Sequence, residues 1–583
     1  MEIQRRKFIK HFSTLGLGLS AIGPSMDRIA QSYYNKIESE GETPVLFFDG
    51  YTEVGPQRVS HSKERKKLGD LIKEMDYCSI SGALVASTMS LSYDAHFSNL
   101  RLSKDLEPYP YLFAIWNVMP HITGEFPNPE ELGKHMKEHN VRAVMIHPKS
   151  NSWDWKGSHC DELFNWLSDQ KILTIIPNFG ELGTWNDVDI FLKKYSQLPV
   201  LLKNISWAAQ RYVIPLVKRH SNLHISFETF QINEGLEYFH EEGLTDQLVF
   251  ASNTPTMSAG AHRTYVDYAQ IPRTAREKIA SGNLIRLLQG QKPPKEKNNR
   301  NEDILMKSIR RGLALPIPII DMHMHILHEG LHGAGRHYRM KNGGPSAVFS
   351  LINKLGYAGG GIMSWDGVVS QDARSGNHTT KAALDSSPGG YWGLGTFDPT
   401  QFTQSEMKKM IENVYSDPRF IGMKPYLLYG REYHHPSYDV WWEYGNKNHF
   451  YGLLHNSRSD LLETDVLAGK YPNVRWIIAH AGNSFSMAEK SIEIMKKHSN
   501  VFAEVTYTTV PLGAVEYLVE EAGADRILYG SDLPMRDPRP QLGWVVFSDL
   551  SLEIKKKILT QNAINVIEPC WNRLPAKSRP TIN

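Results

Sequence analysis

The sequence predicts an α/β protein made of two tandem (β/α)8 barrels, or TIM barrels, and three observations predict this fold class. Short apolar runs alternate with longer amphipathic segments along the chain, which is typical of parallel βα units. Each half of the chain contains eight such runs. The length of 583 residues also suits two barrel domains of roughly 250 residues each.

Eight strands are predicted in the C-terminal half, each bounded by polar, glycine or proline residues. They are Pro316–His325, Gly359–Trp365, Tyr391–Phe397, Phe420–Tyr426, Phe450–His455, Val474–His480, Val501–Thr506 and Arg526–Asp532. Amphipathic segments such as Gln404–Val414 and Ser486–His498 lie between them and predict helices. Because each crossover returns to a neighbouring parallel strand, this order predicts a closed barrel.

The N-terminal half repeats this plan. Its predicted strands are Val45–Asp49, Gly82–Ala86, Tyr111–Trp116, Val141–His147, Ile172–Asn178, Pro199–Asn204, Leu223–Phe227 and Leu248–Asn253. Positions 246 and 525, 252 and 531, 255 and 534, and 283 and 562 carry the same residue type at one constant separation. A constant separation over that span predicts an internal duplication, with chance similarity between barrel strands as the alternative.

Four segments follow from this organisation. Residues 289–301 have no apolar periodicity, and their Pro, Lys and Asn content suits an exposed linker. We therefore place a signal segment at 1–30, a first barrel at 40–288, a linker at 289–303 and a second barrel at 304–583.

The first residues predict an export signal. Gln4–Lys10 contains an arginine pair, and a glycine-rich, mildly apolar run from Phe12 to Gly23 follows it. This arrangement resembles a twin-arginine signal, which implies a periplasmic or other extracytoplasmic location. A basic N-terminus of a cytosolic helix is the alternative. No other stretch of the sequence reaches the ~20 apolar residues of a membrane span.

Composition points to a small-molecule partner. Lys and Arg number 65 and Asp and Glu 63, a net charge of +2, so no basic surplus favours nucleic acid or an anionic membrane. Cys78, Cys160 and Cys570 have no CxxC spacing, and they predict neither a thiolate metal site nor a disulfide framework.

Histidines and a carboxylate follow four predicted strands of the second half. His323 and His325 project to the same side because strand side chains alternate. His455, His480 and Asp532 stand at other strand ends, which share the catalytic face of a barrel. These ligands, without a thiolate, predict one divalent metal ion, with Zn²⁺ favoured and Mn²⁺ or Fe²⁺ as alternatives.

The motifs around these residues resemble the amidohydrolase superfamily, and more closely its amidohydrolase-related (amidohydrolase 2) family. They are Asp321–His325, Leu454–Asn456, Ala479–Gly482 and Tyr529–Pro534. The resemblance implies one tightly held metal, hydrolytic or non-oxidative decarboxylating chemistry, and acidic, often aromatic or lactone-like, substrates. It also implies the metal ligands His323, His325, His455 and Asp532, with His480 polarising the substrate or acting on the metal-bound water.

The chemistry of these groups agrees with that implication. A divalent cation lowers the pKa of bound water to roughly 7. Asp532 can take the proton of that water and return it to the leaving group, and His480 can stabilise an oxyanion. Lys424 stands where two-metal relatives carry a carboxylated lysine, but we expect it unmodified and contacting substrate. Arg458 is a second substrate-binding candidate, with a surface arginine as the alternative.

The first half lacks the candidate metal ligands of the second half. Asp49–Glu53 replaces the histidine motif of the first strand, Pro177 or Asn178 replaces the fifth-strand histidine, and Asn253 replaces the eighth-strand aspartate. We expect a degenerate copy that binds no catalytic metal. Because related single barrels often pair, we expect this copy to act as a pseudo-dimer partner of the second barrel.

The function predicted from the sequence is that of an exported metal-dependent hydrolase. It would use a metal-activated water on a C–O or C–N bond of a small, acidic or lactone-like substrate. A metal-dependent decarboxylase is the first alternative, because the same residues would serve it. A ligand-binding protein without catalysis is the second. The sequence does not identify the substrate, which depends on loop conformation.

Overall fold

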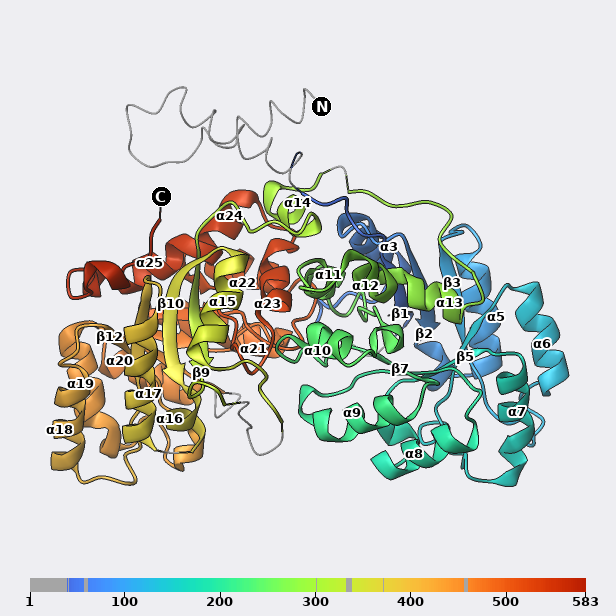
Figure 1. Ribbon diagram of the computed structural model, residues 1–583, viewed down its shortest axis with the longest axis horizontal. Coiled ribbons are helices and arrows are strands. Elements are labelled where there is room, and N and C mark those ends of the chain that lie inside the picture. The colour runs from blue at the N-terminus through green and yellow to red at the C-terminus, as the bar shows by residue number, and fades with distance from the viewer. Residues whose placement is uncertain are drawn as a thin grey trace.

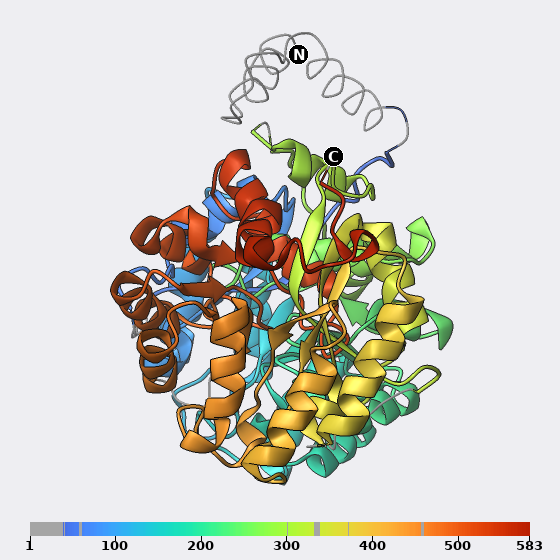
Figure 2. The same ribbon diagram turned by 90° about the vertical axis from the view of Figure 1, so that its left-hand side faces the viewer.

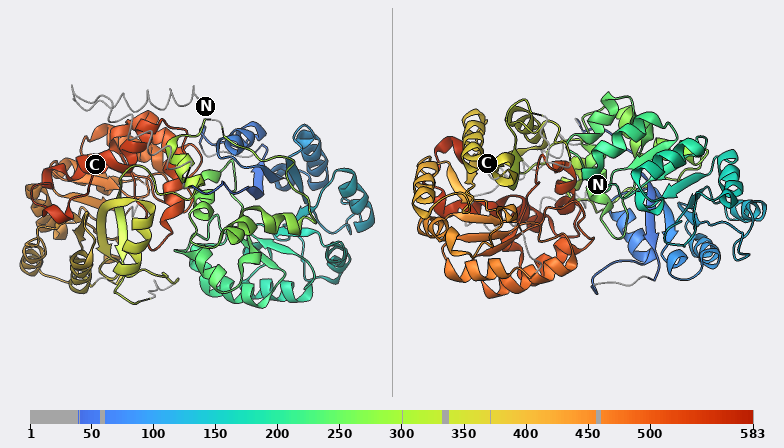
Figure 3. Two further views of the ribbon diagram at one scale, coloured as in Figure 1. Left: turned by 45° about the horizontal axis from the view of Figure 1, so that its top comes forward. Right: turned by 90° about the horizontal axis from the view of Figure 1, so that it is seen from below.

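The protein is described from a computed structural model that covers residues 39, 41–56, 61–299, 301–331, 338–370, 372–455 and 460–582. It contains two eight-stranded sheets, with β1 to β8 in one and β9 to β16 in the other, each in sequence order. Every paired strand runs parallel to its neighbour. The predicted pair of (β/α)8 barrels is thereby confirmed, and Figures 1 and 3 show the barrels side by side.

The first barrel spans β1 to α13. Its strands are β1 (Phe48–Val54), β2 (Gly82–Ser87), β3 (Leu112–Asn117), β4 (Ala143–Met145), β5 (Leu173–Ile176), β6 (Val200–Leu202), β7 (Leu223–Ser226) and β8 (Leu248–Val249). Its helices are α3 (Leu68–Tyr77), α4 (Met89–Ser92), α5 (Ala95–Leu106), α6 (Pro129–Glu138), α7 (Asp161–Asp169), α8 (Trp185–Lys194), α9 (Gln210–Arg219), α10 (Gly235–Glu241), α11 (Ala259–Asp267), α12 (Arg273–Glu277) and α13 (Asn283–Leu287).

The second barrel spans α14 to α25, and its helices face the viewer in Figure 2. Its strands are β9 (Ile319–Ile326), β10 (Tyr357–Ser364), β11 (Tyr391–Gly395), β12 (Phe420–Met423), β13 (Tyr451–Leu454), β14 (Arg475–Ile478), β15 (Val501–Glu504) and β16 (Ile527–Leu528). Its helices are α14 (Ile304–Arg310), α15 (Pro345–Leu355), α16 (Trp365–Val369), α17 (Ala373–Ser386), α18 (Gln404–Val414), α19 (Asp439–Asn448), α20 (Leu462–Lys470), α21 (Phe485–Lys497), α22 (Ala514–Ala522), α23 (Pro538–Val546), α24 (Leu552–Lys556) and α25 (Asn562–Ile567).

Local sequence explains where the outer helices begin and which face they bury. α18 begins with a capping box, in which Thr403 and Glu406 each satisfy a backbone N–H of the first turn. Its buried residues, Met407 and Ile411, are four positions apart and therefore lie on one face. α21 begins at the N-cap Ser484 and carries two lysines in its last turn, where positive charge interacts favourably with the helix dipole.

Hydrogen bonds close each barrel between its first strand and the segment after its eighth. In the first barrel, Gly50 N donates to Phe250 O at 2.8 Å and Asn253 N to Tyr51 O at 3.1 Å. In the second, Met322 N donates to Tyr529 O at 3.1 Å and Asp532 N to His323 O at 2.7 Å. Neither sheet therefore presents an open edge at this place.

The first strand extends further than the sequence predicts. β1 runs to Val54, whereas the apolar run ends at Asp49. Asp49 and Thr52 are fully buried, and both are hydrogen bonded. Asp49 accepts from Ser252 N at 3.0 Å, and Thr52 donates to Leu84 O at 2.8 Å. Polar residues can continue a strand into a barrel when the barrel supplies their partners.

Aromatic side chains fill the second barrel, and its strand glycines make room for them. Trp392 Nε1 donates to Tyr451 Oη at 2.7 Å, and both side chains are buried. A Cβ at Gly361 would lie 2.4 Å from Tyr451 Oη, and one at Gly422 would lie 2.5 Å from Leu394 Cγ. These glycines mark places where another side chain crosses the strand closely.

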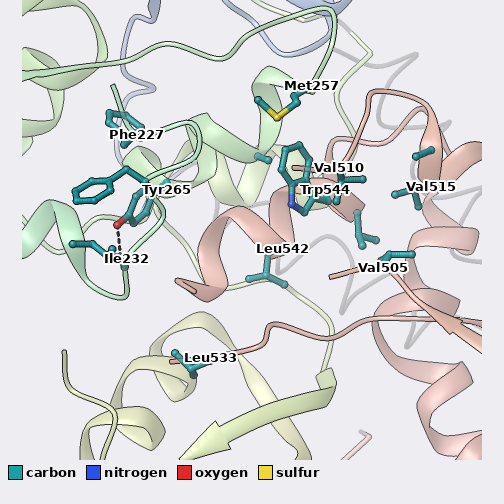
Figure 4. Packing of buried hydrophobic residues seen from close by; sticks show 14 of the residues in the cluster. Phe227, Ile232, Met257, Tyr265, Val505, Val510, Val515, Leu533, Leu542 and Trp544 are labelled. Carbon is teal, nitrogen blue, oxygen red and sulfur yellow. Dashed lines mark hydrogen bonds between the residues drawn. The ribbon is translucent and has the colours of Figure 1, made fainter. Parts of the chain in front are cut away.

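The two barrels pack through helices at the same place in each. α11 follows β8 and α23 follows β16, and the two helices lie against each other. Their glycines allow this approach, because a Cβ at Gly260 would lie 2.1 Å from Phe547 Cβ and one at Gly543 would lie 2.4 Å from Ala261 Cα. Figure 4 shows apolar residues of both barrels, among them Met257 and Trp544, in this region. One apolar cluster includes residues of both barrels, and buried polar contacts such as Arg539 with Glu237 also cross the interface.

Loop contacts between the barrels are reciprocal. After its sixth strand the first barrel places Trp207 against Tyr338, which lies in the segment after the first strand of the second barrel, with ring centroids 4.2 Å apart. After its sixth strand the second barrel places Phe485 against His61, which lies in the segment after β1, at 5.0 Å. Each barrel thus contacts the other through corresponding segments, as in an isologous dimer.

Two predicted segments lie before and between the barrels in the sequence. The backbone N–H groups of Lys297 and Asn299 in the linker donate to Ser81 Oγ and Ser79 Oγ, so the linker lies against the first barrel. The predicted signal segment, 1–30, lies outside the described residues. Within the described part of the chain, no helix combines the length and apolar character needed to cross a membrane.

Candidate metal centre

β9 carries two histidines into the mouth of the second barrel. The strand is buried along its length, and His323 and His325 are both at most 2% exposed. Asp321 fixes the strand, because its Oδ1 accepts hydrogen bonds from His323 N at 2.9 Å and Ser531 N at 3.1 Å. Burial raises the pKa of Asp321 to about 7. Asp321 therefore positions the two histidines from beneath the site.

Asp532 brings a carboxylate to the same place. It follows β16 in a left-handed backbone conformation with φ of 57°, which is uncommon for non-glycine residues but more frequent for Asp and Asn. Its Oδ1 lies 3.4 Å from His325 Nε2 and 3.6 Å from His323 Nε2. One ligand atom from each of these three residues lies within 4.8 Å of the others, close enough to share one ion.

His480 presents one ring nitrogen to this group. Its Nδ1 lies 2.8 Å from Thr506 O, and because a carbonyl only accepts, Nδ1 carries the proton. Nε2 is then a bare acceptor in the neutral ring, and it lies 4.0 Å from Asp532 Oδ2. Burial lowers the pKa of His480 to about 4. The ring is therefore neutral at physiological pH.

His455 lies at the same mouth, beside His480. The two ring centroids are 5.1 Å apart, and Tyr433 Oη holds the His455 carbonyl at 2.8 Å. His455 is not among the residues whose ligand atoms lie within 4.8 Å of one another. The structure thus brings His323, His325 and Asp532 together and places His455 next to them, across the ring of His480.

Glu504 is a buried carboxylate to which sequence reasoning assigned no role. It ends β15, is fully buried, and accepts from His480 N at 3.0 Å and Thr506 N at 2.8 Å. With His323 and His480 it forms a second group of close ligand atoms. Burial raises its pKa to about 8. The sequence signal was an acidic residue at the end of an otherwise apolar strand.

Arg536 is the second residue that sequence reasoning missed. It is buried, it forms an ion pair with Asp532 through Nη1, and its Nε donates to Thr508 Oγ1 at 2.6 Å. Burial disfavours ionisation of Asp532, but the guanidinium group of Arg536 outweighs it and holds the pKa of Asp532 well below its ordinary range. The available signal was an arginine four positions after the strand-end aspartate.

The predicted substrate-binding residues have different outcomes. Lys424 is buried, and its Nζ lies 3.4 Å from His323 Nε2, so it lies directly against the histidine cluster. Burial lowers the pKa of Lys424 to about 8. Arg458 lies outside the described residues, and its predicted role stays a prediction.

The donor set fits a divalent metal ion. Burial lowers the pKa of His323 and His455 well below the ordinary value, and it lowers that of His325 as well, so all three are neutral imidazoles. Neutral imidazole and ionised carboxylate are the forms that bind metal. Nδ1 of His325 is buried without a hydrogen-bond partner in the described residues, while Nε2 of the same ring faces Asp532.

The first barrel presents other groups at the matching strand ends. Tyr51 and Glu53 lie on β1, Pro177 follows β5, and Asn253 follows β8 with φ of 60°. Tyr51 Oη donates to Glu53 Oε1 at 3.2 Å. Of these four side chains only Glu53 carries a strong ligand for a divalent cation.

A surface cavity of about 460 Å³ lies at the other end of the second barrel. Residues before β13 to β16 form it, including His449, Asn473, Asn500 and Asp525. Catalytic groups of such barrels gather at the carboxyl ends of the strands. The candidate site is therefore the mouth that contains His323, and not this cavity.

Comparison with known proteins agrees with the geometry of the second barrel. Residues 320–567 match the family described as amidohydrolase, and no curated protein matches the chain. The fold and donor set define a (β/α)8 barrel with a candidate metal site at its mouth. The family match lies within the second barrel and covers less than half of the chain.

Solved structures also resemble this chain. 5-carboxyvanillate decarboxylase of Sphingomonas paucimobilis is 12% identical, with 42% of this chain and 99% of that chain covered and a TM-score of 0.35. A dihydroxybenzoic acid decarboxylase of a Polaromonas species, solved with manganese and 2-nitroresorcinol, is 16% identical, with 43% and 97% covered and a TM-score of 0.32. A protein of Pseudomonas putida assigned as a 2-pyrone-4,6-dicarboxylic acid hydrolase is 13% identical, with 42% and 98% covered and a TM-score of 0.33.

Proposed function

We propose that the protein is an exported metal-dependent hydrolase of the amidohydrolase-related type, acting on a C–O or C–N bond of a small acidic or lactone-like substrate. One observation carries the proposal. His323, His325 and Asp532 offer ligand atoms within 4.8 Å of one another, and the bare Nε2 of His480 lies 4.0 Å from Asp532. A divalent ion held there would be zinc first, with manganese or iron as alternatives, because the donors are imidazole and carboxylate.

The residues around that ion divide the work of hydrolysis. When bound, the ion would polarise a carbonyl and acidify water. Asp532 is ionised and can accept a proton at a carboxylate oxygen, then return it to the leaving group. The tautomer of His480 makes Nε2 an acceptor, which favours action on the water over polarisation of the substrate. Lys424 supplies positive charge beside His323 for an acidic substrate.

The metal and the reaction are tested together. Metal analysis of the purified full chain should find about one divalent ion per chain, and chelation should remove activity that zinc or manganese restores. A panel of lactones, amides and aromatic acids, with a parallel assay for released carbon dioxide, separates hydrolysis from decarboxylation. Release of carbon dioxide would favour the decarboxylase over the hydrolase as the function. A chain that binds ligands but has neither metal nor turnover would support the alternative of a ligand-binding protein without catalysis.

The N-terminal segment supports the export part of the proposal. The arginine pair Arg5 and Arg6 precedes an uncharged, glycine-rich run. Replacing both arginines with lysine should leave the protein in the cytoplasm, as measured by cell fractionation. An unchanged distribution between compartments would contradict twin-arginine export.

The first barrel is, in this proposal, a degenerate copy that serves as pseudo-dimer partner. Support comes from the reciprocal contacts of Trp207 with Tyr338 and of Phe485 with His61. Residues 302–583 expressed alone should aggregate or lose activity, because they would expose the apolar face of α23. A soluble, monomeric and fully active half would contradict the proposal.

A further inference from the structure

A row of aromatic rings leads from the first barrel to a histidine of the candidate metal centre. Trp207, in the short helix Trp207–Ala209 after β6, meets Tyr338 with ring centroids 4.2 Å apart. Tyr338 lies 6.3 Å from Trp365, and Trp365 lies 4.9 Å from His325. Tyr338 and Trp365 also belong to one small apolar cluster, and Trp207 packs against it from the first barrel.

The segment that carries Trp207 is fixed to the second barrel. The side-chain amide of Gln210 donates to Trp207 O at 3.1 Å and to Arg339 O at 2.9 Å. Asn233, also from the first barrel, donates to Lys341 O at 2.8 Å. These bonds join both sides of the interface next to Tyr338. Trp207 is therefore held in position relative to the second barrel's site.

Arg536 lies between aromatic rings from both barrels. The centre of its guanidinium group is 4.8 Å from the ring of Tyr507 and 6.0 Å from the ring of Trp207. Its recorded hydrogen bonds use Nε, to Thr508, and Nη1, to Asp532. Among the described residues none accepts a hydrogen bond from Nη2. Arg536 thus has N–H groups left for an anionic ligand at the edge of the candidate site.

Trp365 supplies a second unused donor. Its side chain is 6% exposed, and its Nε1 is buried without a hydrogen-bond partner among the described residues. Leaving a buried donor without a partner is unfavourable, so its position beside His325 points to a ligand that accepts from it. Trp365 adjoins His325 and Arg536 adjoins Asp532, so both donors lie beside residues of the candidate metal centre.

We propose that Trp207 of the first barrel forms part of the wall of the second barrel's substrate site and determines its specificity. The site receives a planar carboxylate, with the acid group at Arg536 and the flat body among Trp207, Tyr338 and Trp365. Charge-assisted bonds from a guanidinium and stacking on rings are the interactions that select such a ligand. The inference rests on the proposed function for the location of the site, and it makes the first barrel part of that site.

Binding of two probes to the zinc-loaded full chain tests the inference. Benzoate should bind the unchanged protein at least about tenfold more tightly than benzamide, which has the same shape without the charge. Trp207→Ala should weaken benzoate binding about tenfold, and Trp207→Phe, which keeps a ring, should weaken it less. Isothermal titration calorimetry measures each dissociation constant.

Trp185→Ala is the matched control. Trp185 stacks on Phe179 and Tyr212 at 4.3 and 5.6 Å on the first barrel's own surface, so its loss should leave benzoate binding unchanged. Failure of benzoate to bind, equal affinity for both probes, or an unchanged affinity in Trp207→Ala would each overturn the inference. Metal content and turnover decide the proposed function separately, so the two can fail independently.

Discussion

The mouths of the two barrels share a set of backbone hydrogen bonds but differ in the side chains that these bonds position. Asp49 accepts from Tyr51 N and Ser252 N at 3.1 and 3.0 Å, and Asp321 accepts from His323 N and Ser531 N at 2.9 and 3.1 Å. Burial raises the pKa of both aspartates to about 7. The same buried carboxylate therefore positions a tyrosine in one barrel and a histidine in the other.

The end of the sixth strand repeats the comparison. Asn204 N donates to Glu228 at 3.0 Å, and His480 N donates to Glu504 at 3.0 Å. Asn204 and His480 also share a left-handed backbone, with φ of 48° and 62°. The backbone hydrogen bond that positions His480 in the second barrel is thus present in the first barrel, where asparagine replaces the histidine. In this fold the backbone hydrogen bonds at a strand end can therefore persist when the reactive side chain changes.

A lysine occupies the centre of the first barrel's mouth. Lys203 Nζ lies 3.4 Å from the centroid of the Tyr51 ring and 3.8 Å from Glu228 Oε1, and Lys203 is 1% exposed. Burial lowers the pKa of Lys203, while Glu228, Glu53 and Asp49 act against that shift. We interpret this ammonium group as a built-in cation in the place where the second barrel gathers its candidate metal ligands.

The largest difference between the barrels should appear when the residue after the eighth strand is substituted in each of them. Asp532→Asn should lower activity by about 10²–10⁴-fold, because it removes a proton acceptor, and it should lower metal content. Asn253→Asp restores only one ligand beside Tyr51 and Pro177, and it should change neither quantity. Steady-state kinetics and metal analysis check both variants. A second metal ion in Asn253→Asp would mean that the first barrel retains a metal site.

The lysine provides the next largest effect. Lys203→Met should leave Glu228 without its cation and destabilise the first barrel by about 3–5 kcal/mol. The lower unfolding midpoint would be measured by calorimetry. Lys203→Met combined with Glu228→Gln removes both charges and should recover most of the loss. An unchanged midpoint in the single variant would show that the ammonium group is not a structural cation.

The sequence predicted the number, order and approximate position of the strands because each is a short apolar run with polar flanks. It did not predict the part of β1 after Asp49, because Thr52 is polar and finds its partner, Leu84 O, only in the folded barrel. The side chains of His323, His325 and Asp532 could be assembled from strand ends alone. Alternation and barrel topology determine those positions.

Other parts of the site depend on contacts that no local pattern records. Trp207 meets Tyr338 across the interface between barrels, and Arg536 lies against rings of both. The position of Glu504 in the sequence does not reveal its role. That role comes from the hydrogen bonds that Glu504 accepts from the backbone N–H groups of His480 and Thr506. The contacts of Trp207 can be known only when the relative position of the barrels is known, and those of Glu504 only when the strand ends of the second barrel are assembled.

A buried acid near the interface gives the first barrel a dependence on pH. Glu74 on α3 accepts from Ser258 Oγ at 2.6 Å and Cys78 Sγ at 3.2 Å, and Ser258 is the N-cap of α11. Burial raises the pKa of Glu74 from 4.5 to about 7, against the hydrogen bonds from Ser258 and Cys78; Glu516 adds to the rise, and Arg65 opposes it. The folded state therefore binds a proton that the unfolded state releases.

The sign of this effect follows from that proton. The contribution of Glu74 is fully present below pH 4.5 and is lost as pH rises through about 7, a change of about 3 kcal/mol. Glu74→Gln lacks the titration, so its stability relative to the unchanged protein should rise between pH 4.5 and pH 8. Denaturant unfolding at several pH values measures it. A difference in stability that is constant with pH would show that Glu74 does not titrate in this range.

The smallest effect should come from the contact that joins the barrels. A Cβ at Gly543 on α23 would lie 2.4 Å from Ala261 Cα, which is backbone and cannot move aside as a side chain would. Gly543→Ala should cost about 1–3 kcal/mol through overpacking, measured as a lower unfolding midpoint. The second barrel's helices are otherwise unchanged, so any accompanying loss of activity would come from altered docking of the first barrel.

Gly469→Ala is the matched control for this variant. Gly469 lies in α20, and a Cβ there would meet only His498 Cε1, at 3.7 Å. Alanine at such a helical position should be neutral or stabilise by about 0.5–1 kcal/mol. If Gly543→Ala behaved like this control, the close approach of α11 and α23 would not limit docking. If it lowered activity together with the midpoint, the second barrel would depend on the position of the first, as the contact of Trp207 with Tyr338 requires.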